Sequence, residues 1–278
     1  GECFQMLMTQ DKKHVKLAKY IAAVGEDITQ SDLVEDLPFY RGSASVKQEM
    51  LQHAIAWGYK HNVIIKKSYE DGIEFLRGET LKVTDLSRMV LSYSTDITEG
   101  YRNERVPFDQ LHKLTQAAGM HWVAHHLAGG YRNEENAIPG FNLAVIDIDG
   151  GTSLQVVRSL MKDYKYHLYT TKRHTDEEHR FRLILPTNYE LALDAKDYKE
   201  FMKSIFAWLP FKTDESYDKR EKKSETYEGG QYIYNDGALF DALDFIPKTS
   251  RNEQHRAAFQ KVESLDNLER WFAQRIAM

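Results

Sequence analysis

Hydrophobic residues in the first part of the chain recur at the spacing of amphipathic helices. Three stretches place their apolar side chains on one face of a helix: residues 14–23, 29–37 and 43–57. The second stretch begins with Thr29-Gln-Ser-Asp32, a sequence typical of a helix N-terminus. The pattern therefore predicts three consecutive helices.

After Gly58 the pattern changes to short β-prone runs. Val63–Ile65 and Ile73–Leu76 flank Glu70-Asp-Gly72, and Asp-Gly between two such runs is a strong signal for a β-hairpin. Three helices followed by a hairpin is the element order of a winged helix-turn-helix. We therefore predict a small winged-helix-like domain over residues 10–80, in which the helix from Ser43 is the candidate recognition helix.

This domain offers few side chains for DNA. The candidate phosphate contacts are Lys47, Lys66, Lys67 and Arg77. Glu49 and Glu70 lie on the same helix and hairpin, so the basic footprint is weak. A winged helix that binds a protein, or only packs, is the alternative.

From about Leu86 onward, strand-like and helix-like runs alternate. Strands are predicted at 89–93, 142–148, 167–171 and 180–185, and helices at 108–118, 153–163 and 195–209. Such alternation indicates an α/β core, here over residues 86–248, with a sheet of mixed pairing and flanking helices. A last helix, at about 252–277, dominates a C-terminal segment, residues 249–278, that we expect to lead toward a further domain.

Composition and charge narrow the function classes. The 278 residues are 42% hydrophobic and 28% charged, which is typical of a folded protein rather than a disordered one. A net charge of -5 excludes a uniformly basic protein that coats nucleic acid, so any nucleic-acid contact must come from local patches. The single cysteine, Cys3, excludes a disulfide framework and a Cys-based zinc cluster within the chain.

The most informative motif is Asn142-Leu-Ala-Val-Ile-Asp-Ile-Asp-Gly150. A fully apolar strand ends in Asp147 and Asp149, whose i, i+2 spacing puts both carboxylates on one face. Two adjacent carboxylates repel each other unless a cation lies between them, and hard oxygen ligands suit Mg²⁺ or Mn²⁺. A pair that only caps the next turn is the alternative.

A cluster of cations and imidazoles follows in Tyr169-Thr-Thr-Lys-Arg-His174 and His179-Arg-Phe-Arg182. Lys172, Arg173 and His174 follow one predicted strand, and Arg180 and Arg182 share a face of the next. Cations beside metal-binding carboxylates suit a triphosphate. A solvated, charged hairpin tip is the alternative. Further acidic residues follow in Phe211-Lys-Thr-Asp-Glu-Ser-Tyr-Asp218.

In this order, the motifs resemble the archaeo-eukaryotic primase superfamily, and most of all the primase-polymerase modules of phages and plasmids. The upstream stretches Leu91-Ser-Tyr-Ser94, Pro107-Phe-Asp-Gln-Leu111 and Gly129-Gly-Tyr-Arg-Asn133 add to the resemblance, which covers about residues 86–248. It implies a DNA primase or polymerase in which Mg²⁺ or Mn²⁺ is bound by Asp147, Asp149 and Asp214. His174 would be the catalytic histidine that contacts the phosphates of the nucleotide, with Lys172, Arg173, His179, Arg180 and Arg182 as further nucleotide contacts.

The resemblance also implies partners and a location. These are a DNA template and primer, nucleoside triphosphates and a replicative helicase, as a domain or a partner, in the cytoplasm of a bacterial or archaeal host of a phage or plasmid. No apolar run is long enough to predict a membrane span.

Two motif positions stay open, and the family's Cys-rich zinc appendage cannot form. The family usually has a small hydroxyl residue two positions before the histidine, where this chain has Lys172, so His179 competes with His174. Asp218 likewise competes with Asp214.

Two other functions compete with a primase-polymerase. Val145-Ile-Asp-Ile-Asp-Gly-Gly-Thr152 resembles the first motif of haloacid dehalogenase phosphatases, in which the first Asp is a nucleophile, and Leu168–Thr171 resembles their second motif. The extra Gly151, and the absence of a use for Arg180 and Arg182, count against that interpretation. The other competitor is a non-catalytic replication or partner-binding module.

Overall fold

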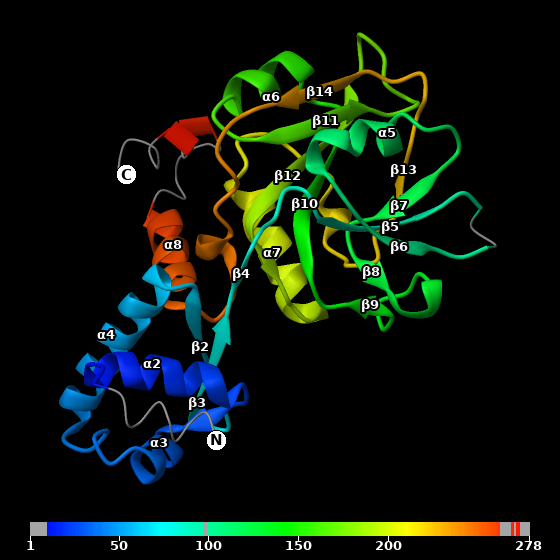
Figure 1. The fold of residues 1–278 in the computed structure, drawn as a ribbon. Coiled ribbons are helices and arrows are strands. Elements are labelled where there is room, and N and C mark those ends of the chain that lie inside the picture. Colours follow the sequence, from blue (N-terminus) through cyan, green and yellow to red (C-terminus); the bar gives the residue numbers. More distant parts are fainter. Residues whose placement is uncertain (1–9, 97–98, 262–267, 270, 273–278) are drawn as a thin grey trace. The chain divides into compact units, whose positions relative to one another are not determined.

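The computed structural model describes residues 10–96, 99–261, 268–269 and 271–272 (Figure 1). The chain forms two compact units. Unit 1 is Gly1–Lys82 with Pro247–Gln254, and unit 2 is Val83–Ile246 with His255–Met278. Among the described residues, no helix combines the length and the apolar character needed to cross a bilayer.

Unit 1 contains the three predicted helices and the predicted hairpin. The elements are α2 (Lys13–Val24), β1 (Ile28–Thr29), α3 (Gln30–Asp36), α4 (Ala44–Lys60), β2 (Val63–Glu70) and β3 (Ile73–Thr80). The strands form an antiparallel sheet in the order β1-β3-β2. Its core is made of apolar faces of the helices and the sheet, including Leu17, Ile21, Leu33, Leu51 and Leu76.

Local chemistry sets the boundaries of these elements. The Thr29 hydroxyl accepts the backbone N–H of Asp32, and the Asp32 carboxylate accepts the N–H of Thr29, which is a capping box at the start of α3. The Ser43 side chain caps α4 by accepting the backbone N–H of Val46. Asp71 (φ 50°) and Gly72 (φ 79°) supply the two positive φ values of a tight hairpin turn.

The C-terminal segment is divided between the two units, with Pro247–Gln254 in unit 1 and His255–Met278 in unit 2. The backbone N–H of Lys67 donates to the carbonyl of Lys248 (2.7 Å), and the N–H of Arg251 donates to the Tyr59 hydroxyl (3.1 Å). The residues around the start of α8 (Ser250–Lys261) therefore complete unit 1 by satisfying backbone groups at the edge of its sheet. Most of the helix predicted beyond Lys261 lies outside the described residues.

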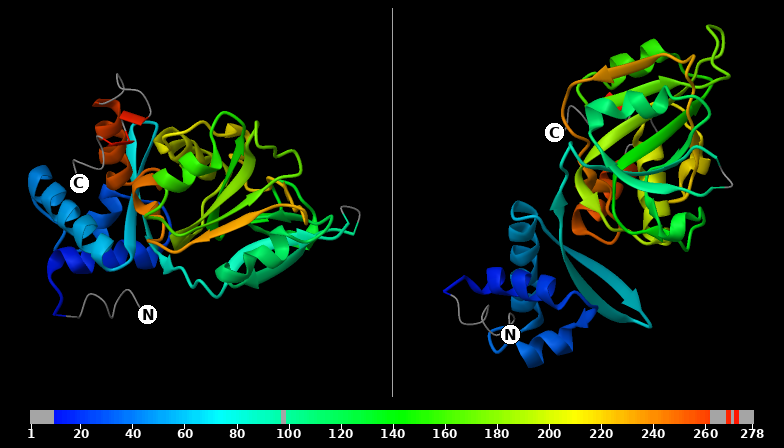
Figure 2. Two further views of the ribbon diagram at one scale, coloured as in Figure 1. Left: turned by 90° about the horizontal axis from the view of Figure 1, so that it is seen from above. Right: turned by 45° about the vertical axis from the view of Figure 1, so that its right-hand side comes forward.

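Unit 2 is built on two antiparallel sheets (Figures 1 and 2). The main sheet has the order β10 (Phe141–Asp149), β12 (Arg180–Leu191), β11 (Tyr166–Thr170), β14 (Tyr232–Asn235), with β4 (Lys82–Val83) also beside β12. The second has the order β13 (Ser224–Glu225), β7 (His121–Val123), β5 (Met89–Ser94), β6 (Arg102–Val106). A two-stranded sheet pairs β8 (His126–Leu127) with β9 (Ala137–Ile138).

The expectation of a mixed sheet was wrong. Every strand pair with a described register is antiparallel, and only isolated bridges are parallel. The reason is the position of β12, which lies between β10 and β11. The strands joined by helix α6 (Leu154–Leu160) run in the same direction but are separated by an antiparallel neighbour, as in a split βαβ unit.

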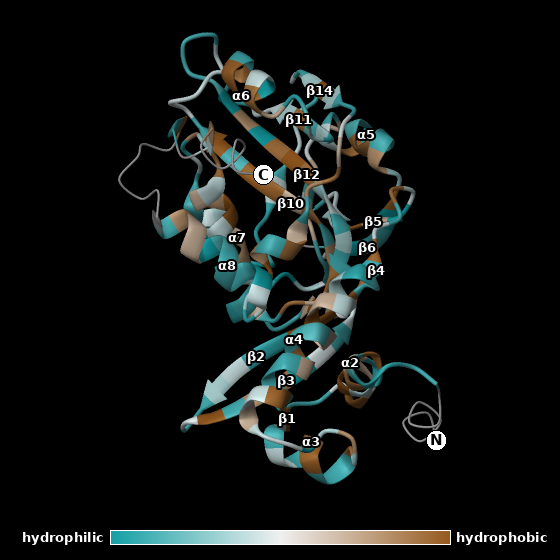
Figure 3. Ribbon diagram, turned by 90° about the vertical axis from the view of Figure 1, so that its left-hand side faces the viewer, coloured by the Kyte–Doolittle hydropathy of each residue, from teal (hydrophilic) through white to brown (hydrophobic). Residues whose placement is uncertain are grey.

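Helices and the second sheet cover the two faces of the main sheet. Figure 2 shows α6 and α7 (Ala195–Trp208) on one side of it, and α5 (Leu111–Thr115) with the second sheet on the other. Hydrophobic residues are concentrated in β10 and β12 (Figure 3), and Leu143, Ile146 and Ile184 are fully buried. Short 3₁₀ turns complete the chain: η1 (Phe108–Gln110), η2 (Ala128–Gly130), η3 (Glu215–Tyr217) and η4 (Ala242–Phe245).

Candidate active site

The two aspartates and the two arginines meet in register on neighbouring strands. Asp147 lies directly opposite Arg182, and Asp149 lies opposite Arg180. Directly opposed residues of an antiparallel pair project from the same face of the sheet. The acid pair and the arginine pair therefore form one charged face at the end of β10 and the start of β12.

The third acidic motif residue joins this face from a distant part of the sequence. The backbone N–H of Asp214 donates to the carbonyl oxygen of Asp147 (2.8 Å). The Asp214 carboxylate caps η3 by accepting the N–H and the hydroxyl of Ser216, both at 2.9 Å. Asp218 is buried, with its carboxylate 3.8 Å from the Lys199 ammonium. Of the two candidates, the structure brings Asp214 to the aspartate pair.

The environment of Asp147 opposes a negative charge on its carboxylate. The side chain is 15% exposed, and burial is the largest effect that raises its pKa. Asp214 and Asp149 raise the pKa further because like charges repel, whereas Arg182 and Lys222 lower it. A cation among these carboxylates would relieve the repulsion.

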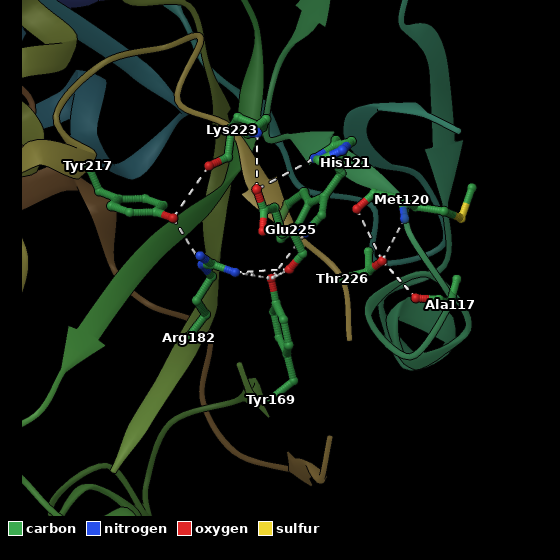
Figure 4. Close-up of polar contacts among 10 residues, drawn as sticks. Ala117, Met120, His121, Tyr169, Arg182, Tyr217, Lys223, Glu225 and Thr226 are labelled. Atoms are coloured by element: carbon green, nitrogen blue, oxygen red, sulfur yellow. Dashed lines mark hydrogen bonds and ion pairs between the residues drawn. The ribbon is translucent and has the colours of Figure 1, made fainter. Parts of the chain in front are cut away.

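Arg182 is already bonded within the protein. Its Nε lies 3.0 Å from Asp147 Oδ1 and 2.9 Å from the Tyr217 hydroxyl. Its Nη1 donates to the Tyr169 hydroxyl (3.1 Å) and to the backbone carbonyl of Glu225 (2.9 Å), as Figure 4 shows. We expected Arg182 to contact nucleotide phosphates; in the structure its largely buried guanidinium binds Asp147 and links β12 to β13.

Arg180 has a different environment at the edge of the site. It forms ion pairs with Asp149 and with Glu178, the second at 2.9 Å. Both partners are about half exposed, so solvent screens these interactions. Lys172 and Arg173 are exposed in the loop between β11 and β12.

Both candidate histidines lie together beside this face. Nδ1 of His174 accepts the backbone N–H of Arg180 (3.0 Å), so the neutral ring carries its hydrogen on Nε2. Nδ1 of His179 accepts the N–H of Leu154 (3.4 Å). The ring centroids are 5.2 Å apart, and burial, followed by the neighbouring His179, lowers the pKa of His174. The structure therefore brings both residues to the site.

The sequence patterns did not indicate the tyrosines that hold Arg182. Tyr169 lies opposite Arg182 on β11, and its buried hydroxyl also accepts the indole N–H of Trp122 (3.2 Å). Tyr217 reaches the same guanidinium from η3. The strand register reveals the Tyr169 contact, and the position of η3 beside β12 reveals the Tyr217 contact, although Tyr217 lies within the acidic motif that was already identified.

In unit 1, the candidate DNA contacts are partly neutralised. Lys66 pairs with Glu79 (3.0 Å) and Lys67 pairs with Glu74 (3.2 Å) on the neighbouring strand. Arg77 is exposed on β3, and Lys47 is half-buried on α4. The basic footprint is therefore weaker than the sequence alone suggested.

The donor set of the acidic face suits a hard divalent cation in its chemistry. It offers carboxylate oxygens from Asp147, Asp149 and Asp214, which repel each other across a partly buried site. In the described ranges, however, no three His, Cys, Asp or Glu side chains are grouped closely enough to hold a metal ion. Binding would require the carboxylates to turn toward one cation and to loosen their arginine pairs.

Comparison with known proteins gave no match: no family model, no curated protein and no solved structure is similar to this chain.

Proposed function

We propose that this protein is a DNA-dependent primase-polymerase that transfers a nucleotide from a nucleoside triphosphate to a primer or first nucleotide. One observation carries the proposal. Asp214, 67 positions after Asp147 in the sequence, donates its backbone N–H to the Asp147 carbonyl, so the third acid motif adjoins the first. This backbone contact brings together the two motifs whose carboxylates would have to turn toward one cation to bind it.

The three aspartates would support nucleotidyl transfer by binding a divalent cation. Asp147, Asp149 and Asp214 would hold Mg²⁺ or Mn²⁺, which when bound lowers the pKa of the attacking hydroxyl and neutralises developing charge. The 3′-hydroxyl loses its proton to solvent as its oxygen forms a bond to the α-phosphorus, the bond from that phosphorus to the bridging oxygen breaks, and pyrophosphate leaves. No protein nucleophile takes part.

The cationic side chains would bind the triphosphate. His174 offers its Nε2–H as a donor to phosphate oxygen because its Nδ1 is held by the backbone. Arg180 lies beside it, and the exposed Lys172 and Arg173 extend the positive surface. Arg182 would act on Asp147 by holding the carboxylate in place.

Unit 1 would contribute to template binding. Its element order, helix, strand, two helices and two strands, and its sheet order β1-β3-β2 support the assignment of a winged helix. With Lys66 and Lys67 paired, Lys47 and Arg77 remain as its main phosphate contacts. A replicative helicase is the partner expected in the same process.

A phosphatase mechanism fits the same motif less well. Its second motif would need Thr170 or Thr171 beside the nucleophile Asp147, but β12 separates β11 from β10. Thr170 is buried, and its hydroxyl accepts the N–H of Gln231 (2.8 Å). Arg182 would also neutralise the nucleophile.

Two assays on the same preparation test the proposal. The first measures incorporation of labelled nucleotides on a primed single-stranded DNA template with Mn²⁺ or Mg²⁺. The second measures hydrolysis of a generic phosphomonoester. We expect incorporation without hydrolysis. Hydrolysis alone would support the phosphatase, and the absence of both activities would support a non-catalytic binding module.

A further inference from the structure

Tyr217 ties the turn that carries Asp214 to the central sheet. The side chain is 5% exposed and lies at the end of η3, three residues after Asp214. Its hydroxyl accepts Nε–H of Arg182 (2.9 Å) and donates to the carbonyl of Lys223 (3.4 Å), as Figure 4 shows. The buried Tyr217 side chain thus holds the turn through partly buried hydrogen bonds.

The turn has two attachments, on neighbouring strands. At its start, the Asp214 N–H donates to the Asp147 carbonyl on β10. At its end, Tyr217 meets Arg182 on β12. Nε of Arg182 serves both the Asp147 carboxylate and the Tyr217 hydroxyl, so one guanidinium joins the first acid motif to the third.

We propose that Tyr217 is a positioning residue that acts through Arg182 to set the placement of Asp214 relative to Asp147, and thereby the affinity of the site for a divalent cation. This inference rests on the proposed function. A cation must draw the carboxylates together, and a turn that is already fixed costs less to order when the cation binds. Tyr217 itself touches neither the cation nor the nucleotide.

Tyr169 provides a matched control. It bonds the same guanidinium through Nη1 (3.1 Å) and donates to the carbonyl of Glu225 (3.1 Å). Like Tyr217 it is a buried tyrosine, but it lies on β11 rather than on the Asp214 turn. Removal of its hydroxyl perturbs Arg182 and the fold without releasing that turn.

The test is a titration of the protein with Mn²⁺ alone, in which free Mn²⁺ is measured by electron paramagnetic resonance. We expect Tyr217→Phe to weaken Mn²⁺ binding about tenfold, or about 1.4 kcal/mol, and Tyr169→Phe to change it less than about twofold. Circular dichroism of each variant verifies folding. In primer extension, saturating Mn²⁺ should restore the turnover of Tyr217→Phe, because the chemistry itself is untouched.

A double-mutant cycle separates positioning from a general effect. If Tyr217 acts through Asp214, Tyr217→Phe should not weaken Mn²⁺ binding further in an Asp214→Asn background. Equal affinities of Tyr217→Phe and wild type, equal losses in the two tyrosine variants, or an unfolded Tyr217→Phe protein would each overturn the inference and leave the proposed function standing. A wild-type protein without Mn²⁺ affinity would overturn both.

Discussion

Ion pairs between neighbouring antiparallel strands occur in both units, but their surroundings differ. In the unit 1 hairpin, Lys66 meets Glu79 and Lys67 meets Glu74. In unit 2, Arg182 meets Asp147, whose pKa is raised by burial and by two further aspartates. Each hairpin carboxylate lies beside a cation on the neighbouring strand, whereas Asp147 has two further carboxylates near it in addition to its arginine partner.

The difference shows what distinguishes a candidate site from a charged surface. Opposite charges alone are common on sheets and contribute little. Asp214 and Asp149 raise the pKa of Asp147 by charge repulsion, and a bound cation would offset that repulsion. We infer that the face of β10 and β12 is built for a ligand, and the hairpin pairs are not.

Substitution of an aspartate of the acidic face should have the largest effect on nucleotide incorporation. Asp147→Asn and Asp149→Asn should each lower nucleotide incorporation at least about 1000-fold, or about 4 kcal/mol, because each removes a charged metal ligand of similar shape. Glu79→Gln, which removes a carboxylate of a hairpin pair, should leave incorporation on the same primed template nearly unchanged. A folded aspartate variant with near wild-type activity would refute the metal assignment.

The loss of unfolding free energy should differ between the Arg182–Asp147 pair and the hairpin pair Lys67–Glu74. Arg182→Ala leaves Asp147 buried without its partner and should cost about 3–5 kcal/mol of unfolding free energy. Lys67→Ala removes a partly exposed partner of Glu74 and should cost about 0–1 kcal/mol. Urea denaturation followed by circular dichroism measures both. Similar losses would mean that the two environments are energetically equivalent.

Substitution of the two histidines should have smaller effects, which appear in the KM for nucleotide. His174→Ala should raise the KM for nucleotide about tenfold, because it removes a backbone-oriented donor worth about 1.4 kcal/mol. His179→Ala should change the KM less than about threefold, since its expected effect is to displace the neighbouring ring of His174. Steady-state kinetics with varied nucleotide decides between them. The reverse order would assign the motif to His179.

The smallest effect concerns unit 1. Because Lys66 and Lys67 are paired, Lys47→Ala combined with Arg77→Ala should weaken DNA binding only about threefold, with a loss that shrinks as salt rises. Deletion of residues 10–80 should spare primer extension and reduce template-specific initiation. Fluorescence anisotropy with labelled duplex and single-stranded DNA at two salt concentrations measures the binding. Unchanged binding after both changes would assign unit 1 to packing or to protein contact.

Much of the fold followed from local sequence patterns. The capping residues Thr29 and Ser43 marked helix starts, and Asp71-Gly72 marked the hairpin, because these signals act over a few residues. The insertion of β12 between β10 and β11 did not follow, since strand order depends on contacts between distant segments. Short strands such as β13 and β14 carry too few residues for a recognisable period.

The sequence indicated the residues of the candidate site better than the contacts among them. The i, i+2 spacings placed Asp147 and Asp149 on one face of a strand, and Arg180 and Arg182 on one face of another. The strand register shows in addition that the two pairs lie opposite each other, which the sequence did not predict. The sequence could not choose between Asp214 and Asp218, because the choice depends on how the turn before η3 meets β10. Nor could it show that the Arg182 guanidinium is enclosed by Tyr169 and Tyr217.

The most direct test of the central claim is a crystal structure with Mn²⁺ and a non-hydrolysable nucleoside triphosphate, with data collected at the manganese absorption edge. We expect an anomalous peak in contact with carboxylate oxygens of Asp147, Asp149 and Asp214, and triphosphate oxygens near His174 and Arg180. A nucleotide bound elsewhere, or manganese absent from these carboxylates at saturating concentration, would contradict it.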